Sequence, residues 1–396
     1  MGEARGIRYA VLGLMGWYLF LITLHYFNQR PLWNDEACVF NSIREYSPVQ
    51  IFSLQLLSIQ QFPKLYLFFI QQLSGHFHFS LLSLRFLPFI CMALAFLTWL
   101  YIGQKEFVHQ RQNLLFALCW AASLPLIYYA AELKQYSMDV AAAAVFVLFL
   151  SRQADLKHHS PIGHRLLLLF LPWLGLFSYI VSVMFLFPVL NILRLKKDNH
   201  KDLWVYLGSC LGVLIIVYYV DWRAGAANAV ILKEQWRDYF ISFHSIPDFL
   251  RTFVEGVNNL MSRWFAETPK WIRMAARFFV AFGLWQMAAG FREQWKKDKH
   301  LFCSVQTVAL IVFIELFLLG ALHVYAFSVV RTSLFFAPMI LLLTVKGIDS
   351  LQSLNRWAHG MVMGLFICYL VYVSIGIAGN ICQGDLGAQS VIWLRR

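Results

Sequence analysis

Residues 9–27 read YAVLGLMGWYLFLITLHYF, an unbroken run with no Asp, Glu, Lys or Arg. An α-helix rises about 1.5 Å per residue, so a helix of this length crosses the roughly 30 Å hydrocarbon core of a bilayer. Arg5 and Arg8 precede the run, and no small-residue cleavage site follows it before Arg30. We therefore expect an uncleaved signal anchor with its N-terminus in the cytoplasm, and a chain built from membrane-spanning helices.

The overall composition agrees with this first stretch. Of the 396 residues, 60% are hydrophobic and only 14% are charged, whereas about a quarter of the residues of a soluble domain are charged. The net charge of +12 comes from short clusters of Lys and Arg between apolar blocks, which is the pattern of cytoplasmic loops. Because these clusters form no continuous basic face, we exclude a nucleic-acid partner. The sequence predicts an all-α integral membrane protein.

Hydropathy and the Lys/Arg bias predict about eleven spans and orient them. The predicted spans are 9–27, 82–103, 114–127, 136–150, 166–177, 180–193, 203–220, 274–289, 301–322, 334–345 and 361–377. This arrangement places the short basic loops on the inner side and two long segments, 28–81 and 221–270, on the outer side. Because the inner loops are too short to build a site, we expect a multi-pass protein of the plasma or inner membrane with its active site on the extracytoplasmic face.

The first outer segment, 28–81, is expected to lie on the membrane rather than to form a separate domain. Ser47 and Pro48 predict a helix start, with the hydroxyl as cap and proline at the first helical position. Apolar residues then recur at helical spacing as far as Ile59, and residues 62–73 form a second apolar stretch that is too short to span. This pattern predicts interfacial helices in the plane of the lipid headgroups.

Asp35 and Glu36 closely follow the first span, beside Trp33, a residue type that anchors proteins at the level of the headgroups. An acidic pair at this place is compatible with an ordinary solvated loop. It is also compatible with a general base for an acceptor hydroxyl, or with part of a site for a divalent cation. We leave a divalent cation open and assign no metal ligands, because the chain contains no Cys/His zinc pattern.

A second polar group follows the third predicted span. Its members Glu132, Gln135, Tyr136 and Asp139 are spaced three and four apart, so in a helix they would share one face. A helix cap with a pair between Glu132 and Lys134 is the simpler interpretation. Asp139 favours function, because a polar group at the edge of the hydrocarbon is costly unless it pairs or lines an aqueous cavity.

Four cations lie near the outer surface, where the charge bias disfavours them, namely Lys64, Arg85, Lys134 and Arg331. Each could simply extend towards the lipid headgroups. A guanidinium group also matches phosphate oxygens with paired donors, and Lys supplies a point charge, so Arg85 and Arg331 are the strongest candidates for binding phosphate. His323, just outside the ninth predicted span, could line the same cavity.

Four motifs occur in order on the predicted outer face: Trp33–Ala37 with its Asp-Glu pair, Phe62–Tyr66, Leu84–Pro88 and Tyr129–Tyr136. Together they resemble the GT-C membrane glycosyltransferases, in particular the glycosyltransferase 39-type branch that includes protein O-mannosyltransferases and the lipid A aminoarabinose transferase. The resemblance covers roughly the first 200 residues, with weaker echoes to about residue 340. The sequence departs from the family pattern at Lys134, where an Arg is usual, and at Gln61 and Phe62, where a His is common.

The resemblance implies a GT-C-like fold and a division of the chain. Residues 1–200 would form a catalytic transmembrane module that includes the outer segment 28–81, and residues 201–396 a variable transmembrane module with the outer segment 221–270. Asp35 would be the catalytic base, and Glu132 a second acidic catalytic residue. The residues expected to bind the donor phosphate or the substrate are Arg331, Lys134, Arg85, Lys64, Glu36, Tyr136, Tyr66 and His323.

The function implied by the resemblance is transfer of a sugar from a polyprenyl-phosphate donor to a hydroxyl of a glycolipid, a polysaccharide or a protein, with inversion at the anomeric carbon. The partners would be that donor, such an acceptor and the membrane lipids, and no cofactor is certain. A transporter or flippase of lipid-linked sugars is the alternative, since it would also have many spans and interfacial acids. Transporters tend to show internal repeats, and none is evident here.

Overall fold

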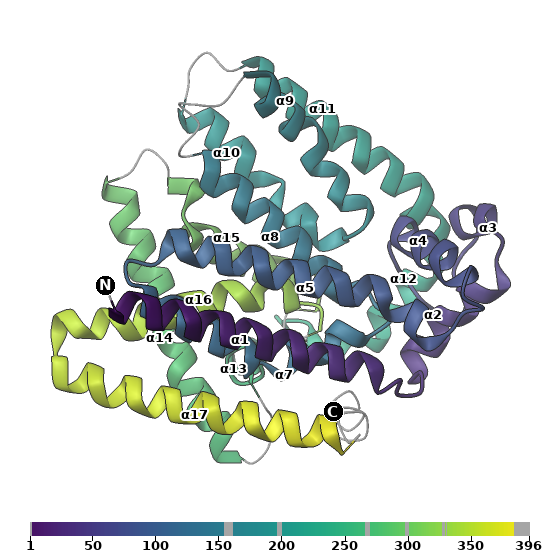
Figure 1. The fold of residues 1–396 in the computed structure, drawn as a ribbon. Coiled ribbons are helices and arrows are strands. Elements are labelled where there is room, and N and C mark those ends of the chain that lie inside the picture. Colours follow the sequence, from purple (N-terminus) through teal and green to yellow (C-terminus); the bar gives the residue numbers. More distant parts are fainter. Residues whose placement is uncertain are drawn as a thin grey trace.

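The computed structural model describes residues 2–153, 161–195, 200–265, 270–297, 301–326, 329 and 331–383, and every regular element in this part of the chain is a helix. The longer helices are α1 (Gly2–Phe27), α5 (Leu81–Glu106), α6 (Gln110–Ala121), α8 (Tyr136–Gln153), α11 (His200–Val217), α14 (Lys270–Lys297), α15 (Val305–Ala321), α16 (Ala337–Leu354) and α17 (Arg356–Cys382). Figure 1 shows α1, α5 and α17 crossing the molecule in roughly the same direction, and α1 packs against α5, α6 and α17.

Shorter helices connect these elements. They are α2 (Asn34–Glu45), α3 (Pro48–Ser53), α4 (Lys64–Gly75), α7 (Leu124–Tyr128), α9 (Pro161–Phe170), α10 (Leu186–Leu195), α12 (Arg223–Gln235) and α13 (Ile246–Ser262). The 3-10 turns are η1 (Tyr129–Ala131), η3 (Leu171–Leu176), η4 (Tyr179–Met184), η6 (Arg237–Tyr239), η7 (Leu301–Cys303) and η8 (Leu334–Phe336), and η5 (Tyr218–Trp222) is a π-helical turn.

The prediction of an all-α multi-pass membrane protein is confirmed. Among the described residues, six helices are long and apolar enough to cross a bilayer, and a seventh span results if the bent pair Gln110–Ala121 and Leu124–Ala131 counts as one. Three shorter apolar helices and α8 cover the remaining predicted spans, so each of the eleven predicted segments falls on helical structure. The number of these segments that cross the membrane stays a prediction.

The main apolar core includes residues from both predicted modules. Trp99 and Trp120 in the first half of the chain are fully buried, as are Phe335 and Leu342 in the second half, and all belong to one cluster. Helix α16 packs against α6, which brings the two halves into direct contact. Residue 200 therefore marks no break in the core, and the division into modules stays a prediction.

The first outer segment gathers at one end of the molecule. Figure 1 shows α2, α3 and α4 together at the end of the bundle opposite to the N-terminus. A second, smaller core holds them there, in which Ile43 from α2 and Tyr66 and Ile70 from α4 pack with Leu84 from α5 and with Leu133. This core joins α2 and α4 to the start of α5 and to the turn before α8.

Two expectations for the outer segments need correction. Helix α3 does begin at Pro48, with the Ser47 hydroxyl accepting from the Gln50 amide, but it ends at Ser53. The chain cannot continue as a helix to Ile59, because Ser58 and Ile59 both have positive φ angles, of 58° and 56°.

The second outer segment, expected as a loop over 221–270, is largely helical in its described part. Helix α11 does not stop at Val220 but continues through η5 into α12, and α13 follows. Charged residues such as Asp221 and Arg223 lower the hydropathy of this stretch, but they do not prevent helix formation. Residues 266–269 of this segment lie outside the described part of the chain, as do residues 384–396.

Candidate active site

Asp35 and Glu36 were expected in a loop, but they lie in the first turn of α2. Acidic side chains are favourable at this position, because the N-terminus of a helix carries a partial positive charge. Glu36 also accepts a hydrogen bond of 3.4 Å from the backbone amide of Trp33, which helps to fix the start of the helix. Consecutive residues of an α-helix point about 100° apart, so the two carboxylates face different surroundings.

Glu36 is the centre of a buried ion-pair network. Its carboxylate, which is 0% exposed, accepts from Arg85 Nε at 3.1 Å and Arg85 Nη2 at 2.8 Å. Arg30 Nη1 donates to the same carboxylate at 2.9 Å, and the backbone amide of Leu133 donates to it at 2.8 Å. A buried charge is tolerated only when it is paired and hydrogen-bonded. Glu36 meets that condition and ties α2, α5 and the turn before α8 together.

The structure does not place Arg85 where it could bind a donor phosphate. All three of its guanidinium nitrogens are engaged, since Nη1 donates to the carbonyl of Arg30 at 2.7 Å while Nε and Nη2 hold Glu36. Its side chain is 1% exposed. We therefore revise the roles expected of Arg85 and Glu36. Their contacts indicate that both hold the first turn of α2 in place and that neither faces a ligand.

Sequence reasoning missed Arg30 as a part of this network. Its guanidinium lies 4.7 Å from the ring centroid of Tyr128 and bonds to Glu36 and to the carbonyl of Ala131. The available signal was its position, because Arg30 follows the first span on the side where the charge bias disfavours cations.

Asp35, in contrast, faces a cluster of cations at the edge of the buried network. Its Oδ2 accepts from Arg331 Nη1 at 2.7 Å and lies 3.5 Å from Lys134 Nζ. The side chain of Asp35 remains 28% exposed. The structure therefore brings together three residues that were expected in one site. Arg331 and Lys134 lie 296 and 99 positions after Asp35 in the sequence (331 minus 35 and 134 minus 35).

Two tryptophans flank the Arg331 guanidinium. The ring centroid of Trp236 lies 4.9 Å from Cζ and that of Trp33 lies 6.0 Å from it. Aromatic faces attract a cation and restrict its orientation. The Nε atom of Arg331 is buried and has no hydrogen-bond partner among the described residues, so the guanidinium retains an unused donor. Trp236 is a second residue that the sequence did not single out, and only its place among mixed aromatic and charged residues hinted at it.

Lys134 is held by polar contacts of both its side chain and its backbone. Its Nζ donates to Gln60 Oε1 at 2.9 Å, and its backbone carbonyl accepts from the Tyr66 hydroxyl at 3.2 Å. Burial lowers the pKa of Lys134, and Arg331 acts in the same direction, whereas Asp35 raises it. Tyr66, expected to bind substrate, is fully buried and instead positions the turn that carries Lys134.

Glu132 lies next to this cluster and has no hydrogen bond. Both carboxyl oxygens are buried and lack a partner among the described residues. Burial raises the pKa of Glu132, and the nearby Glu36 raises it further, while the cations Arg30, Lys134 and Arg331 act against the shift. A protonated carboxyl group can donate a hydrogen bond, so Glu132 is suited to donating one rather than to removing a proton.

Glu132 and Asp139 do not share a helix face, contrary to expectation. Helix α8 begins only at Tyr136, because Glu132 takes up an extended conformation and the next residue, Leu133, directs its amide to Glu36. Asp139 is explained by a hydrogen bond from the Ser178 hydroxyl. Tyr136 packs edge-on against Tyr129, with ring centroids 5.0 Å apart, and lies close enough to Asp35 and Arg331 to interact with their charges.

Lys64 and His323 are engaged elsewhere. The ammonium of Lys64 is buried and donates to the carbonyls of Phe52 at 3.3 Å and Leu54 at 2.7 Å, at the C-terminal end of α3. Cations stabilise helix C-termini by such contacts, so the expected role in donor binding receives no support. His323 stacks on Phe240, with centroids 5.2 Å apart, and its Nε2 lies 3.2 Å from the carbonyl of Ile241.

The described residues do not form a metal centre. No group of three or more His, Cys, Asp and Glu among them lies close enough together to hold an ion. The carboxylates of Asp35 and Glu36 are instead engaged by cationic side chains. A divalent cation therefore does not fit this arrangement, and we derive no step through one.

Comparison with known proteins gives a likeness of fold. No family model and no curated protein sequence matches the chain. The oligosaccharyltransferase of Archaeoglobus fulgidus, in a crystal structure of its complex with Zn and sulfate, matches 95% of the chain with a TM-score of 0.54 and 13% identity. A second structure, of the archaeal oligosaccharyltransferase AglB from the same organism with an inhibitory peptide and a dolichol-phosphate, matches 96% at 12% identity and a TM-score of 0.49.

The chain spans about half the length of these oligosaccharyltransferases, since it covers 53% and 56% of them. At so low an identity the likeness concerns the fold, and it agrees with the fold expected from the four motifs. The specific branch of the family is not distinguished by it. The described part of the chain therefore has a fold like that of the archaeal oligosaccharyltransferase, which agrees with the GT-C-like fold expected from the motifs.

Proposed function

We propose that this chain transfers a sugar from a polyprenyl-phosphate donor to a hydroxyl acceptor at the outer membrane face, with inversion at the anomeric carbon. The observation that carries the proposal is the convergence of Asp35 with Arg331 and Lys134, at 2.7 and 3.5 Å. A carboxylate beside two cations provides a base next to an anion-binding site, which is what a phosphate leaving group requires.

In the proposed reaction, the acceptor oxygen attacks the anomeric carbon from the face opposite to the phosphate, so the configuration inverts. The bond between the anomeric carbon and the phosphate oxygen breaks, and the acceptor proton passes to Asp35. The polyprenyl phosphate then departs with the bonding electron pair. Arg331 and Lys134 would stabilise the negative charge that develops on the phosphate oxygens.

Donor binding would also change the state of Asp35. Arg331 and Lys134 now neutralise its carboxylate, but a phosphate group would compete for the same donors. Guanidinium binds phosphate with paired hydrogen bonds, and the unused Nε of Arg331 offers one of them. The donor phosphate would thus draw the cations away and leave Asp35 free to accept a proton, which would couple donor binding to activation of the base.

The neighbouring residues would hold this arrangement in place. Glu36 and Arg85 fix the first turn of α2 from the buried side, and Tyr66 fixes the turn that carries Lys134. Glu132, with its raised pKa, would donate a hydrogen bond to the sugar or the acceptor. The archaeal protein with a similar fold is an oligosaccharyltransferase, and a related sugar transfer by this chain fits the arrangement of Asp35, Arg331 and Lys134.

The outer location follows from the charge bias of the loops. The site lies beyond the C-terminal end of α1, whose other end carries Arg5 and Arg8. Short basic segments remain in the cytoplasm, so the end of α1 that leads to Asp35 is proposed to face outward.

The test is to incubate the purified full-length chain with a polyprenyl-phosphate sugar and a hydroxyl acceptor and to measure release of polyprenyl phosphate. We expect turnover by the wild type and a loss of about 100-fold to 10,000-fold in Asp35→Asn, the range for removal of a general base. Asp238→Asn is the matched control, because Asp238 is an exposed acid in the same outer region. Its turnover should equal that of the wild type.

Two results would contradict the proposal. Substantial turnover by folded Asp35→Asn would remove Asp35 as the base. Movement of the intact donor across liposome membranes, without release of polyprenyl phosphate, would instead identify a flippase of lipid-linked sugars.

A further inference from the structure

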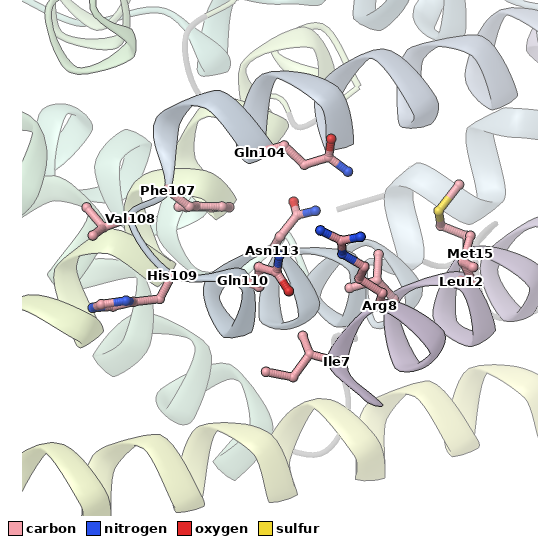
Figure 2. Close-up of a pocket in the computed structure, with 11 residues that line it drawn as sticks. Ile7, Arg8, Leu12, Met15, Gln104, Phe107, Val108, His109, Gln110 and Asn113 are labelled. Carbon is pink, nitrogen blue, oxygen red and sulfur yellow. The ribbon is translucent and has the colours of Figure 1, made fainter. Parts of the chain in front are cut away.

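A second site lies at the opposite end of α1 from Asp35. There the first turns of α1, the end of α5 and the start of α6 line a cavity of about 530 Å³ (Figure 2). Helix α1 contributes Arg8, while Gln104 and Asn113 come from α5 and α6. The candidate span Arg5–Phe27 has 23 residues and is therefore about 35 Å long. The cavity and the candidate active site consequently lie at opposite ends of this candidate span.

One side of the cavity is polar and its groups are not used by the protein. Figure 2 shows the guanidinium of Arg8 and the side-chain amides of Gln104 and Asn113 turned towards the same space. Arg8 forms no ion pair or hydrogen bond with any residue that the structure describes. Asn113 is 5% exposed, and its Oδ1 is buried without a partner in the described part of the chain. That oxygen faces Gly103 of α5 and is closed to a ligand, so the amide nitrogen is the group of Asn113 that a ligand could use.

The charge of the cavity selects an anion. No Asp or Glu is found among the described residues that line it, so the positive charge of Arg8 is not neutralised locally. A guanidinium and amide groups together provide several donors for phosphate oxygens. The amide nitrogen of Asn113 adds a further donor to these groups.

The other side of the cavity is apolar and open to lipid. Leu12 and Met15 follow Arg8 by four and seven positions, so they lie one and two turns deeper on the same face of α1. Leu12 is 58% exposed, and Val108 on the opposite wall is 85% exposed. An apolar wall that leads from a cation into the hydrocarbon region fits an acyl chain, and free phosphate would make no use of it.

We propose that this cavity binds one anionic phospholipid. The phosphate would lie on Arg8, Gln104 and the amide nitrogen of Asn113, and an acyl chain would run along Leu12 and Met15. Basic pockets between membrane helices recognise anionic headgroups through such contacts. The proposal is independent of the sugar transfer, since it concerns the other end of the bundle.

The experiment measures binding of phosphatidylglycerol to the purified full-length chain in neutral detergent by native mass spectrometry. Arg8→Gln should weaken binding about 10-fold, as loss of a charge-assisted hydrogen bond implies. Gln104→Leu, which leaves every charge in place, should weaken it about 3-fold. Arg5→Gln is the matched control, because Arg5 is an exposed cation on the same helix and does not line the cavity. Its binding should equal that of the wild type.

Phosphatidylcholine and inorganic phosphate are the comparison ligands. Phosphatidylglycerol should bind more tightly than phosphatidylcholine and should not be displaced by inorganic phosphate at millimolar concentration. Equal losses in Arg8→Gln and Arg5→Gln would show a general attraction to positive charge and would overturn the proposal. Equal binding of the two lipids would overturn it as well, and binding of inorganic phosphate with the same affinity would replace the lipid by a free anion.

Discussion

Asp35 and Glu36 are adjacent in the sequence, yet the structure places them in two different electrostatic settings. Glu36 is fully buried and receives hydrogen bonds from Arg30, Arg85 and a backbone amide. Asp35 is partly exposed and meets Arg331 and Lys134 at the edge of that network. One carboxylate stabilises the fold of the outer segment, and the other remains accessible to a ligand. From this comparison we expect that Glu36 holds in position the helix turn that carries Asp35.

Glu36→Gln should produce the largest change in stability. The substitution leaves the buried guanidinium groups of Arg30 and Arg85 without a counter-charge, which costs about 3–5 kcal/mol. Thermal unfolding in detergent measures this loss. Glu45→Gln on the same helix is the control, because that side chain is 52% exposed and its pair with Arg44 is worth about 0–1 kcal/mol. Equal midpoints for the two variants would show that Glu36 does not hold the segment.

Arg331→Gln should affect activity rather than stability. Under the proposed function it removes a donor to the leaving phosphate, and kcat/KM should fall about 100-fold to 1000-fold. Arg331→Lys should lose less, because it keeps the charge but not the planar fork or the stacking on Trp236. Arg237→Gln is the matched control, since Arg237 is a neighbouring cation with a side chain that is 70% exposed. Similar losses in Arg331→Gln and Arg237→Gln would contradict a specific role for Arg331.

Glu132→Gln tests whether the Glu132 carboxyl group, which lies between the Glu36 network and the cations around Asp35, is protonated. The pKa of Glu132 in the folded chain is raised above the ordinary 4.5. Between the two pKa values, the folded chain keeps the proton and the unfolded chain has lost it. The wild type should therefore lose stability relative to the variant as the pH rises from 5 towards 8. Unfolding midpoints of both proteins across this range measure the difference. Parallel pH profiles would contradict a buried, protonated Glu132.

Activity of the same variant separates two roles for Glu132. A side chain that only donates a hydrogen bond is largely replaced by the amide of Gln, so turnover should persist. Loss of turnover at every pH would instead indicate that Glu132 takes part in proton transfer.

Lys64→Met should give the smallest of these effects. It removes the ammonium group that donates hydrogen bonds to the last carbonyls of α3, and the loss of stability should be about 1–3 kcal/mol. The KM for the polyprenyl-phosphate sugar should not change, because Lys64 is engaged away from Asp35. Arg44→Gln, at an exposed site on α2, is the control for stability and should change it by at most about 0.5 kcal/mol. A raised KM in Lys64→Met would restore its expected role in donor binding.

The sequence predicted the helical class and many of the helix positions well. Apolar runs of sufficient length mark the spans, and the Ser47-Pro48 pair marked the start of α3. The ends of elements were less predictable. Helix α3 stops at Ser53, where Leu54 takes up an extended conformation. Helix α11 continues into α12 through charged residues that hydropathy interprets as a loop. Neither outcome is visible in local composition.

For the candidate site, the motifs and the outer cations named residues that lie close together in the structure. Asp35, Glu132, Lys134 and Arg331 are close enough for their charges to interact, although they come from three parts of the chain. The motifs could not separate residues that face the site from those that support it. Arg85, Lys64 and Tyr66 have suitable chemistry, but each is occupied by a partner that lies far away in the sequence.

The amino-acid sequence by itself determined that this is a multi-pass helical membrane protein, because the cost of placing charge and unpaired backbone in hydrocarbon depends on local composition. It also determined which cations and acids were available near the face that the charge bias predicts to be the outer one. Only the tertiary structure decided that Glu36 turns inward to two arginines while Asp35 meets Arg331. A buried charge is stable only beside a partner, and the partners Arg85 and Arg331 come from segments that meet α2 only in the folded chain.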